Sequence, residues 1–299
     1  MAFSEPIVVG VRSERGLPYS RYLMAQSLSA SGLAPERAYE LADAVRRRLG
    51  ESAKRVIAIH ELHELVIEVL VAEEGEEAAR RFGDWQRLDR LDRPLVVMLA
   101  GTTGVGKSTL ATMLANRLGI TRVIATDVIR HVLRSFLSAD FMPAVHYSAF
   151  EAAAAVEEGE LGDADLVGFE RQAALIGIGI AAIVERACTE GTPIVIEGVH
   201  VLPGAIDEEL RRRCLLVEAL VVVRDQQLHR GHFAMRPGQR PAGRYLDRFD
   251  EIRKLQEHLT RRATDAGVAV IDNTSIDGAL ADALAVVRES VSRLSSPAP

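Results

Sequence analysis

The sequence is short of cysteine, of net charge and of long apolar runs. Its 299 residues include two cysteines, Cys188 and Cys214, which are too few for a disulfide framework and do not lie in a CxxC or Cys/His spacing. The formal net charge of −6 is spread over both halves of the chain, and the basic domain expected of a nucleic-acid-binding protein is missing. These absences exclude a disulfide-stabilised scaffold and predict no nucleic-acid partner.

Two further absences concern location. The first fifteen residues contain acids and no apolar core, so we expect no signal peptide. No run approaches the roughly 18 apolar residues of a membrane span, so we expect no membrane partner and a cytoplasmic protein. A chain of 299 residues with 48% hydrophobic content is long enough for two domains with sizeable cores. The sequence leaves a homo-oligomer open.

The strongest motif begins at a predicted buried strand. Leu95–Ala100 is an unbroken apolar run with two β-branched residues, typical of a strand that is buried on both faces. The next residues, Gly101–Ser108, read GTTGVGKS and match the P-loop pattern at every fixed position. A helix is expected from there to Leu118, because apolar residues recur at three- and four-residue spacing. Strand, loop and helix together are the context that this motif requires.

The residue types of this loop suit a phosphate chain. Its glycines allow the positive φ and the close approach that turn backbone N–H groups toward phosphate. Lys107 is expected to reach the β- and γ-phosphates, and the Ser108 hydroxyl to take one Mg²⁺ position. We therefore expect ATP with Mg²⁺, with the nucleotide bound by Gly101, Thr102, Thr103, Gly104, Val105, Gly106, Lys107, Ser108 and Thr109.

Two acids follow other predicted strands. Val123–Thr126 is a short strand that delivers Asp127, and Arg130 follows at the start of a helix. Pro193–Glu197 is a buried strand that ends in an acid, the Walker B position. Ligands of open α/β sheets lie beyond the carboxyl ends of the strands, so these side chains should face the phosphates.

Each of these residues has a functional and a structural interpretation. Asp127 can accept a proton from an attacking hydroxyl or hold a Mg²⁺-bound water, and it is also well placed as an N-cap. Arg130 can clamp an anionic substrate or be a surface arginine. Glu197 can hold the Mg²⁺ shell or orient a nucleophile. The predicted metal set is Ser108, Asp127 and Glu197.

A Gly-rich segment after the predicted strand Leu215–Val223 carries many arginines. They are Arg230, Arg236, Arg240, Arg244, Arg248 and Arg253. This spacing suits a lid that closes on phosphates and excludes water; the alternative is a solvated basic face. By contrast, Ser135–Glu170 contains no Lys or Arg, and we expect a helical insertion there that offers only hydroxyl or imidazole donors. The predicted catalytic set is Lys107, Asp127, Arg130, Glu197, Arg240 and Arg244.

Residues 1–92 are expected to form a separate strand-plus-helices module, and residues 93–299 the nucleotide-binding domain. The order of elements in this mainly helical module resembles the ATP-cone, a regulatory nucleotide-binding domain. The likeness lies in Val9–Arg12, Gly16–Ser20, Ser27–Leu28, Gly32–Leu33 and Ala38. Arg12 and Arg15 are its candidates for a nucleotide-binding basic pair. The alternative is a domain that serves packing alone.

The chain as a whole resembles 2-phosphoglycerate kinase. The stretches that carry the likeness are Tyr19–Ser20, Ala38–Ala42, Gly104–Gly106, Ser108–Thr109, Arg117–Ile120, Ala125–Asp127, Ile129–Arg130, Gly168–Glu170, Ile196–His200, Pro203–Gly204, Arg244–Leu246, Ile252–Arg253, Gln256 and Ile271–Asn273. The resemblance implies ATP-dependent phosphorylation of the 3-hydroxyl of 2-phosphoglycerate, a small phosphorylated hydroxy acid, to give 2,3-diphosphoglycerate. It also implies an α/β fold of the P-loop kinase type, with a parallel sheet flanked by helices.

One departure from that family concerns the P-loop. Archaeal members often carry Thr where this chain has Lys107, so the Lys restores the ordinary motif and suggests a separate subgroup. Two other functions therefore stay open. One is a kinase for another acceptor, such as an inositol phosphate or a sugar acid. The other is a nucleotide-responsive regulatory P-loop protein, against which the Asp127/Arg130 pair and the lid arginines speak.

Overall fold

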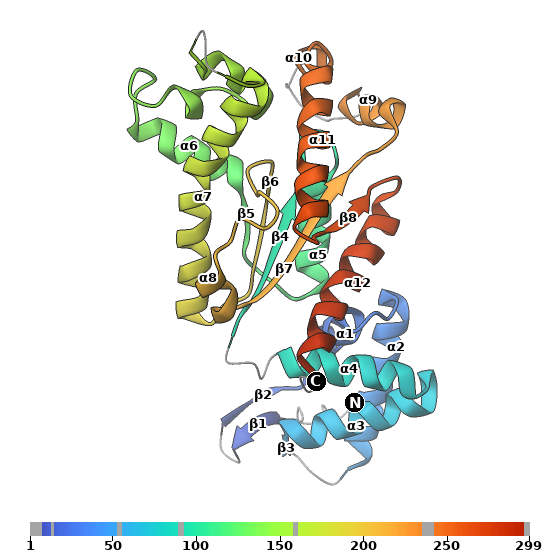
Figure 1. Ribbon diagram of the computed structural model, residues 1–299. Helices are drawn as coiled ribbons and strands as arrows, with labels where there is room; N and C mark the ends of the chain where they lie inside the picture. Colours follow the sequence, from blue (N-terminus) through green and yellow to red (C-terminus); the bar gives the residue numbers. More distant parts are fainter. Residues whose placement is uncertain are drawn as a thin grey trace. The chain divides into compact units, whose positions relative to one another are not determined.

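The computed structural model describes residues 8–12, 15–52, 56–88, 93–157, 161–234 and 242–295. The chain forms two compact units (Figure 1). Each unit has its own hydrophobic core. The first comprises Met1–Leu91 with Arg117–Gly119 and Val291–Pro299, and the second comprises Asp92–Asn116 and Ile120–Ser290.

The first unit joins a small sheet to a group of helices. Strand β1 (Val8–Arg12) pairs antiparallel with β2 (Arg15–Pro18) and parallel with β3 (Val56–Ala58), which gives the order β2-β1-β3. The helices are α1 (Arg21–Ala30), α2 (Pro35–Glu51), α3 (Ile59–Glu74) and α4 (Glu76–Leu88). Each helix contributes to the core of this unit through side chains that include Leu28, Leu41, Val66 and Phe82.

Helix α2 shows how the sequence builds this core. Pro35 stands in the first turn, where a missing N–H costs nothing. The buried positions repeat at the three- and four-residue spacing of one helix face; they are Ala38, Leu41, Ala42, Val45 and Leu49. The side chains of Arg12 and Arg15 lie outside what the structure describes, and the likeness of this unit to an ATP-cone stays a prediction.

The second unit is built on a five-stranded sheet in the order β5-β6-β4-β7-β8. Every neighbouring pair is parallel. The strands are β4 (Leu95–Ala100), β5 (Val123–Ala125), β6 (Ile194–Gly198), β7 (Leu215–Val222) and β8 (Ala269–Asp272). All residues of β4 and β6 are buried, as expected of strands that are covered on both faces. The predicted α/β fold with a parallel sheet flanked by helices is confirmed.

The helices of this unit, apart from the last residues of α5 and α12 that belong to the first, connect and cover the strands. They are α5 (Lys107–Arg117), α6 (Thr126–Phe136), the 3₁₀ helices η1 (Pro143–His146) and η2 (Ala149–Ala155), α7 (Ala164–Glu190), α8 (Glu208–Arg213), α9 (Gln226–Ala234), α10 (Ala242–Leu246), α11 (Phe249–Asp265) and α12 (Ile276–Ser295). Helices α7 and α11 share one core cluster with the sheet, which includes Met98 of β4, Phe169 of α7 and Leu259 of α11.

Helix α7 is long and apolar enough to cross a membrane by length and composition, and it is the one helix of the described residues that meets this criterion. Its buried side chains belong to the core of the second unit, and Phe169, Ile176, Ile180 and Val184 are each at most 3% exposed. A core helix meets the same criterion, and the packing of α7 on the sheet is that of a core helix.

Candidate active site

The P-loop follows the central strand β4 and depends on glycine at two positions. Gly104 and Gly106 have φ angles of 92° and 82°, in the left-handed region that favours glycine. A Cβ on Gly106 would lie 2.4 Å from Nδ2 of Asn273, and one on Gly104 would lie 2.5 Å from the ring of Phe233. A larger residue at either position would displace a loop that packs directly on α9 and on the segment after β8.

Side chains from later in the chain hold three successive carbonyl groups of this loop. His229 donates from Nε2 to the oxygen of Thr103, and His232 donates from Nδ1 to that of Gly104, both at 2.9 Å. The amide of Asn273 donates to the next carbonyl at 2.8 Å. A carbonyl only accepts, so each ring nitrogen in these bonds carries its proton. These contacts fix the shape of the loop before any phosphate arrives.

Glu197 lies directly beneath the start of α5. Strand pairing sets it opposite Leu99 of β4, and it is only 5% exposed. Its Oε1 accepts a hydrogen bond from Oγ of Ser108 at 2.9 Å, while Oε2 is buried without a hydrogen-bond partner, 3.9 Å from Nζ of Lys107. A buried carboxylate oxygen left without a donor, beside a hydroxyl, is an arrangement that suits a hard cation with oxygen ligands.

Asp127 stands in the first turn of α6 and faces the loop across the cavity. The N-cap of α6 is Ala125, so the interpretation of Asp127 as an N-cap is wrong. Partial desolvation at the cavity wall acts to raise the pKa of Asp127, but the positive charges of Arg130 and Lys107 and the hydrogen bond from Arg130 outweigh it and hold the pKa below its usual value. The side chain is open to the solvent of the cavity, with 64% of its surface exposed. A carboxylate is therefore present there at neutral pH.

A buried polar chain supports the residue next to Asp127. The Thr126 hydroxyl bonds to Nδ1 of His200 at 3.0 Å, and Nε2 of His200 bonds to Oε1 of Gln172 at 2.9 Å. An amide oxygen only accepts, so His200 carries its proton on Nε2 and Thr126 donates to Nδ1. Burial lowers the pKa of His200 to about 3, and the neutral imidazole fits both bonds. These contacts give His200 a structural role.

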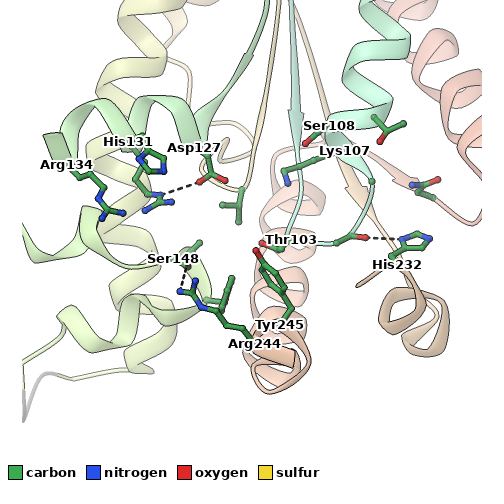
Figure 2. A pocket seen from close by; sticks show the side chains of 18 of the residues that line it. Thr103, Lys107, Ser108, Asp127, His131, Arg134, Ser148, His232, Arg244 and Tyr245 are labelled. Carbon is green, nitrogen blue, oxygen red and sulfur yellow. Dashed lines mark hydrogen bonds and ion pairs between the residues drawn. The ribbon is translucent and has the colours of Figure 1, made fainter. Parts of the chain in front are cut away.

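One cavity of about 830 Å³ brings most of the predicted site together (Figure 2). The predicted residues that line it are Thr103, Gly104, Gly106, Lys107, Ser108, Thr109, Asp127, Arg130 and Arg244. Other predicted residues do not line it: Gly101, Thr102 and Val105 are buried residues of the loop itself, and Glu197 is buried and bonded to Ser108. Arg240 lies outside the described residues.

Arg130 and Arg244 both reach the cavity, and both are already bonded to protein groups. Arg130 donates from Nε to Asp127 at 3.3 Å and from Nη1 to the carbonyls of Val145 and Tyr147 at 3.3 and 3.2 Å. Its side chain is only 11% exposed. Arg244 forms an ion pair with Glu151 of η2 and also donates to Ser148 at 3.2 Å. Each arginine thus ties two segments of the cavity wall together.

The other described arginines of the predicted lid lie away from the cavity lining. Arg230 stacks over the ring of Phe249, with its guanidinium carbon 3.9 Å from the ring centroid. Arg253 donates to the carbonyl of Val223 at 2.6 Å, and Arg248 forms an ion pair within the first turn of α11. Among the described lid arginines, Arg244 is the one that lines the cavity.

Two cavity residues of α6 were missed from the sequence. His131 and Arg134 line the cavity together with Asp127 (Figure 2) and with Arg130. The sequence contains a pattern that predicts their place, because these four residues lie at positions i, i+3, i+4 and i+7, which share one face of a helix. Asn273 and the two histidines of α9 were also missed, because their contacts with the loop join segments far apart in the chain.

The P-loop lies at the central strand of a parallel sheet, and an acid and arginines face it across one cavity. This arrangement defines a P-loop kinase, which is an ATP-dependent phosphotransferase.

No protein-family model matches the chain. Its sequence is nevertheless similar to archaeal proteins named 2-phosphoglycerate kinase. The protein of Methanothermobacter thermautotrophicus is 36% identical over 266 residues, which cover 87% of this chain and 86% of that one. That of Pyrococcus horikoshii is 37% identical over 262 residues, with 87% and 86% covered. The chain belongs to the 2-phosphoglycerate kinase family.

The likeness extends over nearly the full length in other members. The 2-phosphoglycerate kinase of Methanococcus maripaludis strain C7 is 32% identical over 303 aligned residues, with 98% of this chain and 97% of that one covered.

Among solved structures, a gluconokinase from Sinorhizobium meliloti matches with a TM-score of 0.39 and 17% identity, over 68% of this chain and 98% of that one. A shikimate kinase from Acinetobacter baumannii matches with 0.40 and 16%, over 69% and 97%. At these scores the structural likeness is loose, and the family assignment depends on the sequence relatives.

Proposed function

We propose that this protein transfers the γ-phosphoryl group of ATP to the 3-hydroxyl of 2-phosphoglycerate and yields 2,3-diphosphoglycerate and ADP. The names of its relatives support this substrate. The observation that carries the proposal is the arrangement of one cavity, in which Lys107 and Ser108 line one side and Asp127 with the arginines of α6 line the other. A cavity of about 830 Å³ is in the range that holds a drug-sized ligand, enough to bring a triphosphate and a three-carbon acid together.

The nucleotide end consists of the P-loop and α5. The backbone N–H groups of the loop would surround the β-phosphate, and the N-terminus of α5 adds its partial positive charge. Lys107 would place its ammonium group against the β- and γ-phosphates, where negative charge increases as the phosphoryl group moves. The carbonyl contacts from α9 and Asn273 keep this cradle in shape, so that binding costs less loop ordering.

The residues beside Ser108 fit a magnesium ion. The buried Oε2 of Glu197 lacks a hydrogen-bond donor, and the hydroxyl of Ser108 lies against the other carboxylate oxygen. Both are hard oxygen ligands of the kind Mg²⁺ prefers. Ser108 and Glu197 would hold the ion, and the carboxylate of Asp127 would hold a water bound to it. When bound, the ion neutralises charge on the β- and γ-phosphates.

The acceptor end consists of Asp127 and the cations of α6. A bond forms between the 3-oxygen of the acceptor and the γ-phosphorus, and the bond from that phosphorus to the β–γ bridging oxygen breaks. The proton of the hydroxyl passes to the carboxylate of Asp127, which is ionised at neutral pH because its pKa lies below its usual value. Arg130 holds this carboxylate in place from Nε, and Arg244 would meet the transferred group if the segment around α10 closes on it.

Acceptor kinetics test the proposal. ADP release by the full chain is measured with 2-phosphoglycerate, 3-phosphoglycerate, glycerate and inositol phosphates, and the product is identified by phosphorus NMR. We expect the highest kcat/KM with 2-phosphoglycerate and one diphosphoglycerate formed per ADP. Lys107→Ala is the control, because activity that survives it comes from a contaminant. A preference for glycerate or for an inositol phosphate would reject this acceptor and keep the kinase assignment.

A further inference from the structure

Helix α6 presents one polar face to the cavity. Asp127, His131 and Arg134 line it (Figure 2), and so does Arg130. The helix rises 1.5 Å per residue, so the Cα of Arg134 lies about 10 Å further along the axis than that of Asp127. A long side chain on a helix points back toward the N-terminus, which shortens that separation. The guanidinium of Arg134 and the carboxylate of Asp127 can therefore face neighbouring groups of one small acceptor.

The arginines of the described cavity lining differ in what they already bind. Arg130 donates to protein groups from Nε and Nη1, and Arg244 is paired with Glu151. Arg134 is exposed to the cavity, and no side chain or carbonyl of the described residues forms a hydrogen bond or an ion pair with it. Its planar group keeps five donors, a fork that matches the oxygens of a phosphate.

The proposed acceptor carries a group that needs such a partner. 2-Phosphoglycerate has a phosphate on the carbon next to the reacting hydroxyl, and its transfer product has two phosphates side by side. Lys107 is committed to the nucleotide, and Arg130 to the carboxylate of Asp127 and to the backbone. Without Arg134, the negative charge of the 2-phosphate would lie near the carboxylate of Asp127, and no unpaired arginine of α6 would offset it.

We infer that Arg134 binds the 2-phosphate of the acceptor, and that Arg130 acts as a positioning residue for Asp127. This inference rests on the proposed function and adds the basis of its specificity. Arg134 makes the enzyme select a phosphorylated hydroxy acid over the same acid without phosphate. Arg134, and not Arg130, then determines which acceptor the enzyme prefers.

Three acceptors separate the groups that Arg134 could recognise. 2-Phosphoglycerate carries phosphate and carboxylate, glycerol 2-phosphate carries only the phosphate, and glycerate carries only the carboxylate. Arg134→Ala should raise the KM for the two phosphate-bearing acceptors by about 10- to 100-fold, the loss of a charge-assisted pair of hydrogen bonds. The KM for ATP and for glycerate should change by less than about threefold, within the range of surface substitutions. Arg134→Lys should give an intermediate KM, because it keeps the charge and loses the fork.

The control is Arg186→Ala, which removes an exposed arginine of α7 that does not line the cavity. It should leave the KM for each of the three acceptors and for ATP unchanged. An equal effect of Arg134→Ala on glycerate and on the phosphates, an effect on glycerate alone, or no effect would overturn the inference while 2-phosphoglycerate remains the substrate. A wild-type chain that phosphorylates neither phosphate-bearing acceptor would instead reject the proposed function, and the inference with it.

Discussion

The imidazole of His200 donates from Nε2 to the side-chain oxygen of Gln172 at 2.9 Å, and both residues are at most 1% exposed. The amide of Gln172 in turn donates to the carbonyl of Tyr147 at 3.0 Å, and Nδ1 of His200 accepts from Thr126. One neutral ring thus connects the start of α6, the middle of α7 and the segment after η1. The residue next to Asp127 is held in place through this connection.

His200→Leu should lower the free energy of unfolding by about 2–5 kcal/mol, because the Thr126 hydroxyl and the Gln172 oxygen are left buried without a partner. Urea denaturation of the full chain measures the change. The control is His258→Leu, which removes a partly exposed hydrogen bond to Glu170 and should cost less than about 1 kcal/mol. Equal losses in the two variants would show that the buried bonds of His200 contribute no more than a surface contact.

The same ring predicts a dependence of stability on pH. Burial, aided by the positive charges of Arg130 and Lys107 and partly offset by Asp127, lowers the pKa of His200 to about 3. The unfolded chain, in which this pKa is about 6.5, therefore binds more protons than the folded chain between these values. Stability is fully present above about pH 6.5 and falls as the pH drops below it. The wild type should lose stability between pH 6.5 and 4.5 more steeply than His200→Leu; parallel curves would assign the titration to other groups.

The part of this site that can be predicted from the sequence depends on how far apart along the chain the contacting residues lie. The P-loop follows from adjacent residues, because Lys107 and Ser108 are placed by the strand and helix on either side. Glu197 and Asp127 follow from the rule that strand ends share one edge of a parallel sheet. The bond from His229 to Thr103 joins residues 126 positions apart, and that from Asn273 to Val105 joins residues 168 apart. Such pairs depend on the packed fold, and no local pattern marks them.

Glu197→Gln should increase the Mg²⁺ concentration needed for half-maximal rate, because it removes charge and leaves the shape of the side chain. Ser108→Ala should do the same, and the double variant should lose less than the sum of the two, since both groups would act on one ion. Initial rates at saturating ATP and acceptor over a series of Mg²⁺ concentrations give these values. The control is Glu218→Gln, which changes a carboxylate bonded to Arg211 outside the cavity lining. Additive losses would place the two residues in separate roles.

Removal of residues 1–92 should leave a folded chain that still transfers phosphate. The described core cluster of the second unit runs from Val96 to Ala263 and draws on none of the deleted residues. Circular dichroism checks the fold, and coupled ADP release checks the activity. If the first unit works as an ATP-cone, a nucleotide that is not a substrate should shift the rate of the full chain and not that of the shortened one. Identical responses of the two chains would remove the regulatory hypothesis and leave a packing role.

Asp127→Asn tests the proton acceptor. It keeps the size of the side chain and its place in the first turn of α6, and it removes the charge that Arg130 and Lys107 stabilise. A general base in the transition state contributes typically about 10²- to 10⁴-fold, so kcat should fall by that factor while the KM for ATP stays within about twofold. Steady-state kinetics with saturating 2-phosphoglycerate measure the change. The control is Asp225→Asn at the start of α9, whose carboxylate accepts from the backbone of Gln227 and Leu228 and does not line the cavity. If Asp127→Asn raises only the KM for the acceptor, Asp127 is a binding residue, and the proton of the hydroxyl leaves by another route.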